Sequence, residues 1–283
     1  MPDLSPLDVL RTTFGYDEFR GDQAQVIDHV IAGGDAIVLM PTGGGKSLCY
    51  QIPAILSATE SDETNPLTLV ISPLIALMKD QVDSLRARNI PATFINSSLT
   101  RQVREQRYQE VGRGDYALLY VTPERFRKPD FLDVIGRRQV RLLAVDEAHC
   151  ISEWGHDFRP DYTRLGDIRE TLGNPTTIAL TATATPDVQR DIVRQLSLTE
   201  NDIRLFHEGI DRPNLSLDVI ESWEDDEKLD HILHIRGEHP GTGIVYFTLI
   251  KTLMRFSDKL WEMEIPHLVY HGDLERRQRK RVQ

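Results

Sequence analysis

The stretch AIVLMPTGGGKS, residues 36–47, decides the fold of this chain. Its first five residues form a continuous apolar run, which is typical of a strand buried on both faces of a parallel sheet. Three glycines follow, and they allow the backbone to curl so that its N–H groups face an anion. A helix that begins near Lys46 would direct its positive end to the same point. The stretch therefore predicts a strand, a phosphate-binding loop and a helix, in that order.

Each residue type in this loop suits a distinct part of a bound nucleotide. Lys46 would bridge the β- and γ-phosphates, and Ser47 would ligate Mg²⁺. The strict pattern has glycine where Met40 stands, and the alternative to a phosphate loop is a glycine-rich hairpin. We expect the phosphates to be held by the following residues: Thr42, Gly43, Gly44, Gly45, Lys46 and Ser47.

Apolar runs and helical patterns alternate on the C-terminal side of this loop. Such alternation predicts a doubly wound α/β sheet of parallel strands. The helix expected at 73–85 would open with a proline, and the helix expected at 100–111 would have a threonine cap. The further strands are expected at 67–71, 116–121, 142–145 and 177–180, and the helices at 73–85, 100–111 and 186–196.

Two carboxylates, Asp146 and Glu147, follow directly after the apolar run 142–145. In an open α/β sheet the carboxyl end of a strand faces the ligand crevice. Asp146 could therefore hold the Mg²⁺ shell, and Glu147 could orient or deprotonate the attacking water. An Asp-Glu pair alone is common in solvated turns, but the phosphate loop about one hundred residues earlier favours the catalytic interpretation.

The pattern changes at residues 207–226, where a polar segment with Gly209 and Pro213 precedes the acidic start of a helix at residue 224. We expect a first domain over residues 1–209 and the beginning of a second domain over residues 210–283. In the second domain we expect strands at 243–247 and 267–271, with a helix at 249–263 between them. These elements are too few to close a core, so we expect an incomplete domain with an exposed strand edge.

Composition narrows the class of protein. The chain has 283 residues and a net charge of −11, which by itself disfavours binding to nucleic acid. Two cysteines exclude a disulfide framework, and the sequence has neither a long apolar segment nor a secretory signal. We therefore expect no membrane contact and a cytoplasmic location, associated with the nucleoid if the source is bacterial. Local basic clusters, which could equally be solvated helix faces, are Arg101, Arg104, Arg107, Arg113, Arg276, Arg277, Arg279, Lys280 and Arg281.

The stretch DEAHCISEWGHDFRPDY, residues 146–162, resembles the RecQ form of the DEAH box with its aromatic-rich loop. Residues 40–47 match the MPTGGGKS of the same family, which explains Met40. Other segments resemble the family's motifs in the family's order: FGY at 14–16 with Phe19, Arg20 and Gln23, SPLIALM at 72–78, VTPER at 121–125, LTATAT at 180–185, DRPN at 211–214 and YHG at 270–272. Asp22 and the stretch at 247–249 depart from the family pattern.

The resemblance implies two RecA-like (P-loop NTPase) domains that close on ATP and Mg²⁺, and 3′→5′ movement along DNA in repair or recombination. It implies that Tyr16, Arg20 and Gln23 contact the adenine. DNA contact and coupling to hydrolysis would fall to the following residues: His149, Trp154, His156, Phe158, Arg159, Thr181 and Thr183. Aromatic side chains in this loop could stack on unpaired bases, although Trp154 and Phe158 could instead form a small apolar core.

Three functions stay open at this stage. The first is a DNA-unwinding motor, expected to be monomeric, that acts on single strands and duplex junctions. The second is an RNA helicase of the related DEAD/DEAH groups, and the third is a nucleotide-gated DNA-binding module. Because the family's arginine finger lies in later motifs of the second domain, we expect these 283 residues alone to hydrolyse ATP weakly and not to unwind DNA.

Overall fold

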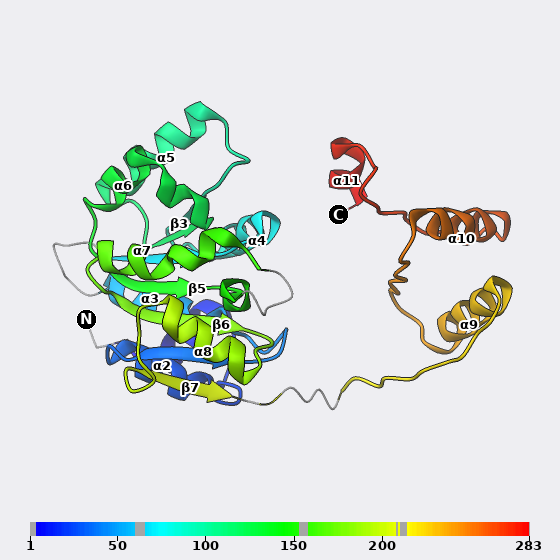
Figure 1. The fold of residues 1–283 in the computed structure, drawn as a ribbon, viewed down its shortest axis with the longest axis horizontal. Coiled ribbons are helices and arrows are strands. Elements are labelled where there is room, and N and C mark those ends of the chain that lie inside the picture. The colour runs from blue at the N-terminus through cyan, green and yellow to red at the C-terminus, as the bar shows by residue number, and fades with distance from the viewer. Residues whose placement is uncertain (1–3, 60–65, 153–157, 208, 210–213, 283) are drawn as a thin grey trace. The chain divides into compact units, whose positions relative to one another are not determined.

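A computed structural model of the chain describes residues 4–59, 66–152, 158–207, 209 and 214–282. The chain divides into two compact units, Met1–Pro213 and Asn214–Gln283 (Figure 1). The sequence places the boundary at 209–210, a few residues earlier. The assignment of the second unit to a RecA-like domain stays a prediction.

The first unit is built on a seven-stranded parallel sheet with the order β3-β4-β2-β5-β6-β1-β7. Because every pair is parallel, all carboxyl ends of the strands lie along one edge. This sheet confirms the predicted doubly wound α/β fold. The strands are β1 Asp35–Leu39, β2 Leu67–Ile71, β3 Ala92–Ile95, β4 Leu118–Val121, β5 Val140–Val145, β6 Thr176–Thr181 and β7 Ile203–His207.

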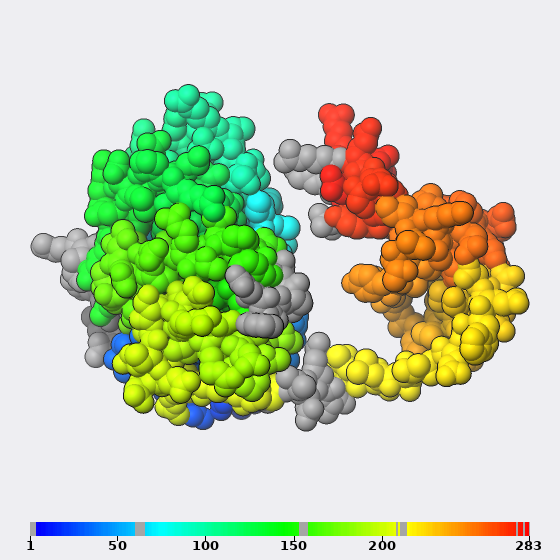
Figure 2. All heavy atoms as spheres, in the orientation of Figure 1, coloured from blue at the N-terminus to red at the C-terminus, as the bar shows by residue number. Residues whose placement is uncertain are grey.

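Helices cover both faces of the sheet. One buried cluster joins the strands to side chains of α2, α3 and α4, and a second joins them to α5, α6, α7 and α8. Figure 2 shows green side chains closing over the second of these faces. The helices of this unit are α1 Pro6–Val9, α2 Gln23–Ile31, α3 Leu48–Thr59, α4 Ile75–Ala87, α5 Arg101–Arg113, α6 Pro129–Ile135, α7 Leu165–Thr171 and α8 Pro186–Gln195, with short turns of helix at η1 Leu10–Phe14, η2 Pro123–Arg127, η3 Ala148–Ile151 and η4 Pro160–Arg164.

Burial on both faces explains why the central strands read as continuous apolar runs. In β1, Ile37 and Leu39 belong to one buried cluster, while Ala36 and Val38 belong to the other. Successive side chains of a strand point to opposite faces, so a strand covered on both sides must be apolar at every position. The same pattern confirms the strands predicted at 67–71, 116–121, 142–145 and 177–180.

The two edge strands were not predicted. In β7 only Phe206 is buried, while Arg204, Leu205 and His207 are exposed; β3 has four residues and lies at the other edge. A half-exposed or short strand lacks the continuous run that identifies a central one. The predicted helices at 73–85, 100–111 and 186–196 correspond to α4, α5 and α8, and the expected cap Thr100 accepts a hydrogen bond from the amide of Val103.

The second unit consists of helices and extended segments in the residues that the structure describes. Its helices are α9 Asp225–Glu238, α10 Ile250–Glu262 and α11 Arg276–Val282. The prediction of strands at 243–247 and 267–271 is wrong, since neither segment forms a strand. The side chains at 243–247 are largely exposed, with 75% of Ile244 and 88% of Tyr246 accessible, and exposed and half-buried residues alternate at 267–271. A strand needs a hydrogen-bonding neighbour, and within this unit none is provided.

Candidate functional site

The phosphate-binding loop lies between β1 and α3, as the sequence predicts. Gly43 and Gly45 have φ angles of 83° and 79°, which lie in the left-handed region. A Cβ atom on Gly44 would stand 2.9 Å from the carbonyl oxygen of Pro41. All three positions therefore require glycine, two for their backbone angle and one for lack of space.

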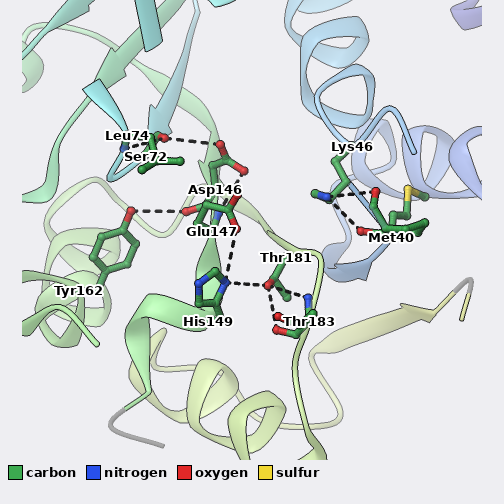
Figure 3. A network of polar contacts seen from close by, with 11 residues as sticks. Met40, Lys46, Ser72, Leu74, Asp146, Glu147, His149, Tyr162, Thr181 and Thr183 are labelled. Carbon is green, nitrogen blue, oxygen red and sulfur yellow. Dashed lines mark hydrogen bonds and ion pairs between the residues drawn. The ribbon is translucent and has the colours of Figure 1, made fainter. Parts of the chain in front are cut away.

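Lys46 lies partly buried in this loop. Its Nζ donates to the carbonyl oxygens of Met40 at 3.0 Å and Pro41 at 3.3 Å. Burial lowers the pKa of Lys46, while the charges of Glu147 and Asp146 oppose that shift. Figure 3 shows its ammonium turned back toward the Met40 carbonyl. An ammonium held only by neutral carbonyls can exchange them for a phosphate, with which it makes stronger, charge-assisted hydrogen bonds.

The segment expected to contact adenine lies at the start of α2. Gln23 is 2% exposed, and its Nε2 donates to the Gly44 carbonyl at 2.9 Å, while its Oε1 accepts from the Arg20 amide at 3.0 Å. The Gln23 side chain thus braces the phosphate loop. Tyr16 and Arg20 are exposed, as a base-stacking or base-contacting pair would have to be.

The carboxylates Asp146 and Glu147 extend from the end of β5. The amide of Asp146 donates to the carbonyl of Ile71 at 2.8 Å, which keeps it in line with β2. Its carboxylate accepts from the Glu147 amide at 3.0 Å and from Ser72 Oγ at 3.5 Å. Burial, assisted by the Glu147 charge, raises the pKa of Asp146 from 3.8 to about 6. The Glu147 amide, the Lys46 charge and the Ser72 hydroxyl oppose this rise in pKa only in part.

Glu147 leads into a polar network on the next strand. His149 lies 3.4 Å from Glu147 Oε2, and its Nδ1 is 3.0 Å from Thr181 Oγ1. The Thr181 hydroxyl in turn donates to the carbonyl of Thr183 at 3.0 Å. Figure 3 shows this chain running from the carboxylates on β5 to the end of β6. The three coupling residues expected from the sequence are therefore joined by contacts.

The aromatic-rich loop begins immediately after η3. Trp154 and His156 lie outside the described residues; Phe158 and Arg159 are partly buried. Arg159 Nη1 donates to the carbonyl of Pro73 at 3.3 Å, which links the end of this loop to the segment after β2.

Several residues of the site were missed in the sequence. Ser72 contacts Asp146, Tyr162 donates to the Asp146 carbonyl at 3.4 Å, and Ser152 donates to Asp191 at 2.6 Å. Ser72 follows β2 as Asp146 follows β5, and these strands are neighbours. Ser72 and Tyr162 lie in stretches that resemble family motifs but had no role assigned to them, and adjacent carboxyl ends could have identified that of Ser72; no sequence signal marks Asp191.

The residues present fit a magnesium ion that is held jointly with a nucleotide. Among the described residues no group of three or more His, Cys, Asp or Glu side chains could hold a metal by itself. Mg²⁺ usually binds through one or two carboxylates together with phosphates and waters, so Asp146 and the Ser47 hydroxyl are the type of ligand set it takes.

The basic cluster on α5 is used within the first unit. Arg101 pairs with Glu105, and Arg113 pairs with Asp115. Arg107 stacks on the Phe94 ring, with its guanidinium 4.3 Å from the ring centre. These contacts favour the interpretation of α5 as a solvated helix face. In the parts of the chain that the structure describes, no helix is long and apolar enough to span a membrane.

The family model for the DEAD/DEAH box helicase matches residues 20–192. The chain is 42% identical over 277 residues to "ATP-dependent DNA helicase RecQ" of Pasteurella multocida, which covers 98% of this chain and 42% of that protein. It is 37% identical over 283 residues to "RecQ-like DNA helicase BLM" of Xenopus laevis, covering 97% of this chain and 20% of that one. The chain thus spans less than half the length of these relatives.

The fold is similar to that of solved helicase structures. Mss116p, bound to ssRNA and AMP-PNP, aligns with a TM-score of 0.74 at 17% identity, covering 98% of this chain and 60% of that one. At this identity the similarity concerns the fold alone.

Proposed function

Because the chain belongs to the DEAD/DEAH box helicase family, in its RecQ branch, we propose that it is the ATP-binding part of a 3′→5′ DNA helicase. The single observation that supports this best is the network from Asp146 and Glu147 through His149 to Thr181. The network links these two carboxylates, beside the phosphate loop, to Thr181 at the end of β6. A nucleotide switch that moves DNA needs such a link between two sites.

In the proposed ATP reaction the phosphate loop binds the triphosphate through its backbone amides and the start of α3. Lys46 moves from the loop carbonyls to the β- and γ-phosphates. Ser47 and Asp146 would hold Mg²⁺, which would supply positive charge against the negative charge of the transferring phosphoryl group. Glu147 orients the attacking water and accepts its proton.

The DNA strand is proposed to lie along the carboxyl edge of the sheet. The segments 72–78 and 121–125 follow β2 and β4 at that edge, and the aromatic-rich loop 154–159 follows β5. Aromatic and arginine side chains there suit unpaired bases and the backbone between them. A monomeric state and a cytoplasmic location stay predictions.

ATP hydrolysis measured with and without single-stranded nucleic acid tests the proposal. We expect stimulation by single-stranded DNA, and a Trp154→Ala variant that keeps its nucleotide affinity while losing most of this stimulation. Stimulation by single-stranded RNA alone would identify an RNA helicase of the same family. Binding of DNA that changes with nucleotide but is accompanied by no hydrolysis in the full-length protein would identify a nucleotide-gated binding module.

A further inference from the structure

Four side chains form a buried, hydrogen-bonded chain beneath the phosphate-binding loop. Tyr50 and Gln51 belong to α3, Tyr120 to β4 and Gln81 to α4. The hydroxyls of Tyr50 and Tyr120 lie 3.3 Å apart. Gln51 Nε2 donates to Tyr120 Oη at 3.2 Å and to Gln81 Oε1 at 2.8 Å. Gln51 therefore joins α3 directly to α4, and Tyr120 of the central strand β4 holds the Gln51 amide from the side.

This chain begins at the residue proposed to ligate magnesium. The amides of Tyr50 and Gln51 donate to the carbonyl oxygen of Ser47 at 3.3 and 3.0 Å. Ser47 immediately precedes α3, and the two buried side chains lie in the first turn of that helix. Any rotation or shift of that turn on nucleotide binding moves the anchoring end of the chain.

The two phenols stay neutral hydrogen-bonding groups. Both are 1% exposed, and burial raises the pKa of Tyr120 to about 12 and that of Tyr50 well above its ordinary value. The Asp146 charge acts on both in the same direction. The chain of hydroxyls and amides is therefore intact across the pH range in which the protein would work.

The helix α4 at the far end of the chain has a second link to the site. It begins at Ile75, three residues after Ser72, whose hydroxyl donates to Asp146 and accepts from the Leu74 amide, both at 3.5 Å. One link thus reaches the beginning of α4 and the other reaches Gln81 in its middle. Breaking either buried contact would leave polar atoms without a partner, so a shift at one end is transmitted rather than absorbed.

We propose that Tyr120 is a positioning residue that orients the Gln51 amide, and that Gln51 transmits the state of the nucleotide at Ser47 to Gln81 of α4. The inference rests on the proposed function, because α4 begins within the proposed DNA-contacting segment 72–78. It assigns to these side chains a role in coupling rather than in binding or chemistry.

The test measures how strongly nucleotide changes the affinity for DNA. Fluorescence anisotropy of a labelled oligothymidine is recorded with the whole protein, with and without AMP-PNP and Mg²⁺. The ratio of the two dissociation constants is the coupling. In Tyr120→Phe, and separately in Gln81→Met, we expect this ratio to move toward one by about fivefold, the factor that corresponds to the loss of one buried hydrogen bond. The double variant should lose little more than either single one.

Tyr116→Phe is the matched control. It also removes a phenol hydroxyl, which donates to Glu110 at 2.6 Å, but it lies outside the chain of contacts. Its ratio should equal that of the wild type. Variants that melt earlier yet keep the wild-type ratio would overturn the inference and make the chain a purely structural feature. If Tyr120→Phe does not fold, Gln81→Met alone decides, since Gln81 is only partly buried. A wild-type protein without any coupling would overturn the proposed function and this inference together.

Discussion

The two units of this chain use similar amounts of apolar sequence in different ways. In the first unit almost every apolar strand residue is buried between helices, as for Leu143, which has no exposed surface. In the second unit Leu217, Val219 and Trp223 are 93%, 96% and 88% exposed. Figure 2 shows the stretch from about residue 215 as a narrow yellow strip. The difference teaches that an apolar run becomes a strand only where neighbouring strands accept its backbone hydrogen bonds.

The two units also differ in which residues are proposed to act on the nucleotide. Every described residue proposed to act on the nucleotide lies in the first unit, close to the carboxyl edge of its sheet. The substitutions below test this separation, and each first-unit change is matched with one in the second unit.

The largest effect is expected from Lys46→Ala. It removes a charge-assisted phosphate contact that backbone amides do not replace, and the loss of one such donor typically lowers turnover by about 10²–10³-fold. Lys251→Ala, at an exposed position of α10, should leave ATP turnover unchanged. Steady-state ATPase assays of both variants decide, and wild-type turnover in Lys46→Ala would disprove the phosphate-loop assignment.

Matched leucine substitutions should sharpen the difference in packing. Leu143→Ala leaves a cavity in β5 between two helical layers and should lower the free energy of unfolding by about 3 kcal/mol. Leu217→Ala removes an exposed side chain and should change it by less than about 0.5 kcal/mol. Urea unfolding followed by circular dichroism measures both. Equal losses would mean that Leu217 is covered in solution.

Asp146→Asn should make the first unit more stable and inactive. The pKa of Asp146 is about 6 in the folded protein and 3.8 in the unfolded chain, so between these values the folded state binds a proton that the unfolded chain releases. Stability therefore falls as pH rises through this window. Removing the charge should raise the free energy of unfolding by about 1–3 kcal/mol at pH 7.5, and by about half as much at pH 5.

Unfolding curves at pH 7.5 and pH 5 test this expectation, for the wild type, Asp146→Asn and a control variant. The control is Asp226→Asn in the second unit, where the carboxylate is exposed and no gain is expected. A gain that did not shrink at pH 5 would show that burial of the Asp146 charge is not its source. Loss of ATPase in wild-type protein below about pH 6 would follow from the same protonation.

The smallest effect is expected at helix starts. The Thr185 hydroxyl accepts a hydrogen bond from the amide of Val188 at the start of α8, and Thr185→Ala should lower the stability of the first unit by about 1 kcal/mol. Glu227→Ala removes the carboxylate that accepts from the amides of Trp223 and Glu224 at the start of α9. Hydrogen exchange should show faster opening of α9 alone, with no change in the first unit.

The sequence predicts the central part of the fold and the phosphate loop well, because both depend on local pattern. Continuous apolar runs identify β1, β2, β4, β5 and β6, and the spacing of three glycines identifies the loop. The edge strand β7 was missed since only Phe206 is buried in it. The strand expected at 243–247 was wrong because an apolar run carries no information about whether a neighbouring strand is present.

The sequence predicted the motif residues of the candidate site but not the residues that hold them in place. Lys46, Asp146 and Glu147 are recognised from sequence because their chemistry dictates their type and spacing. The supporting contacts depend on which elements become neighbours in the fold. They are made by Ser72, Gln23 and Tyr120. Contacts between elements distant in sequence are set by topology, so local patterns do not reveal them.

The sheet order places a constraint on how the chain acquires its phosphate loop during synthesis. Strand β1 ends at Leu39, yet its two neighbours are β6, which begins at Thr176, and β7, which ends at His207. A ribosome that adds about 5–20 residues per second needs on the order of ten seconds to make that interval. Until β6 and β7 have been made, β1, which leads into the phosphate loop at 40–47, has no neighbouring strand to bond its backbone. The nascent protein should therefore gain affinity for nucleotide late and abruptly, when β6 and β7 emerge.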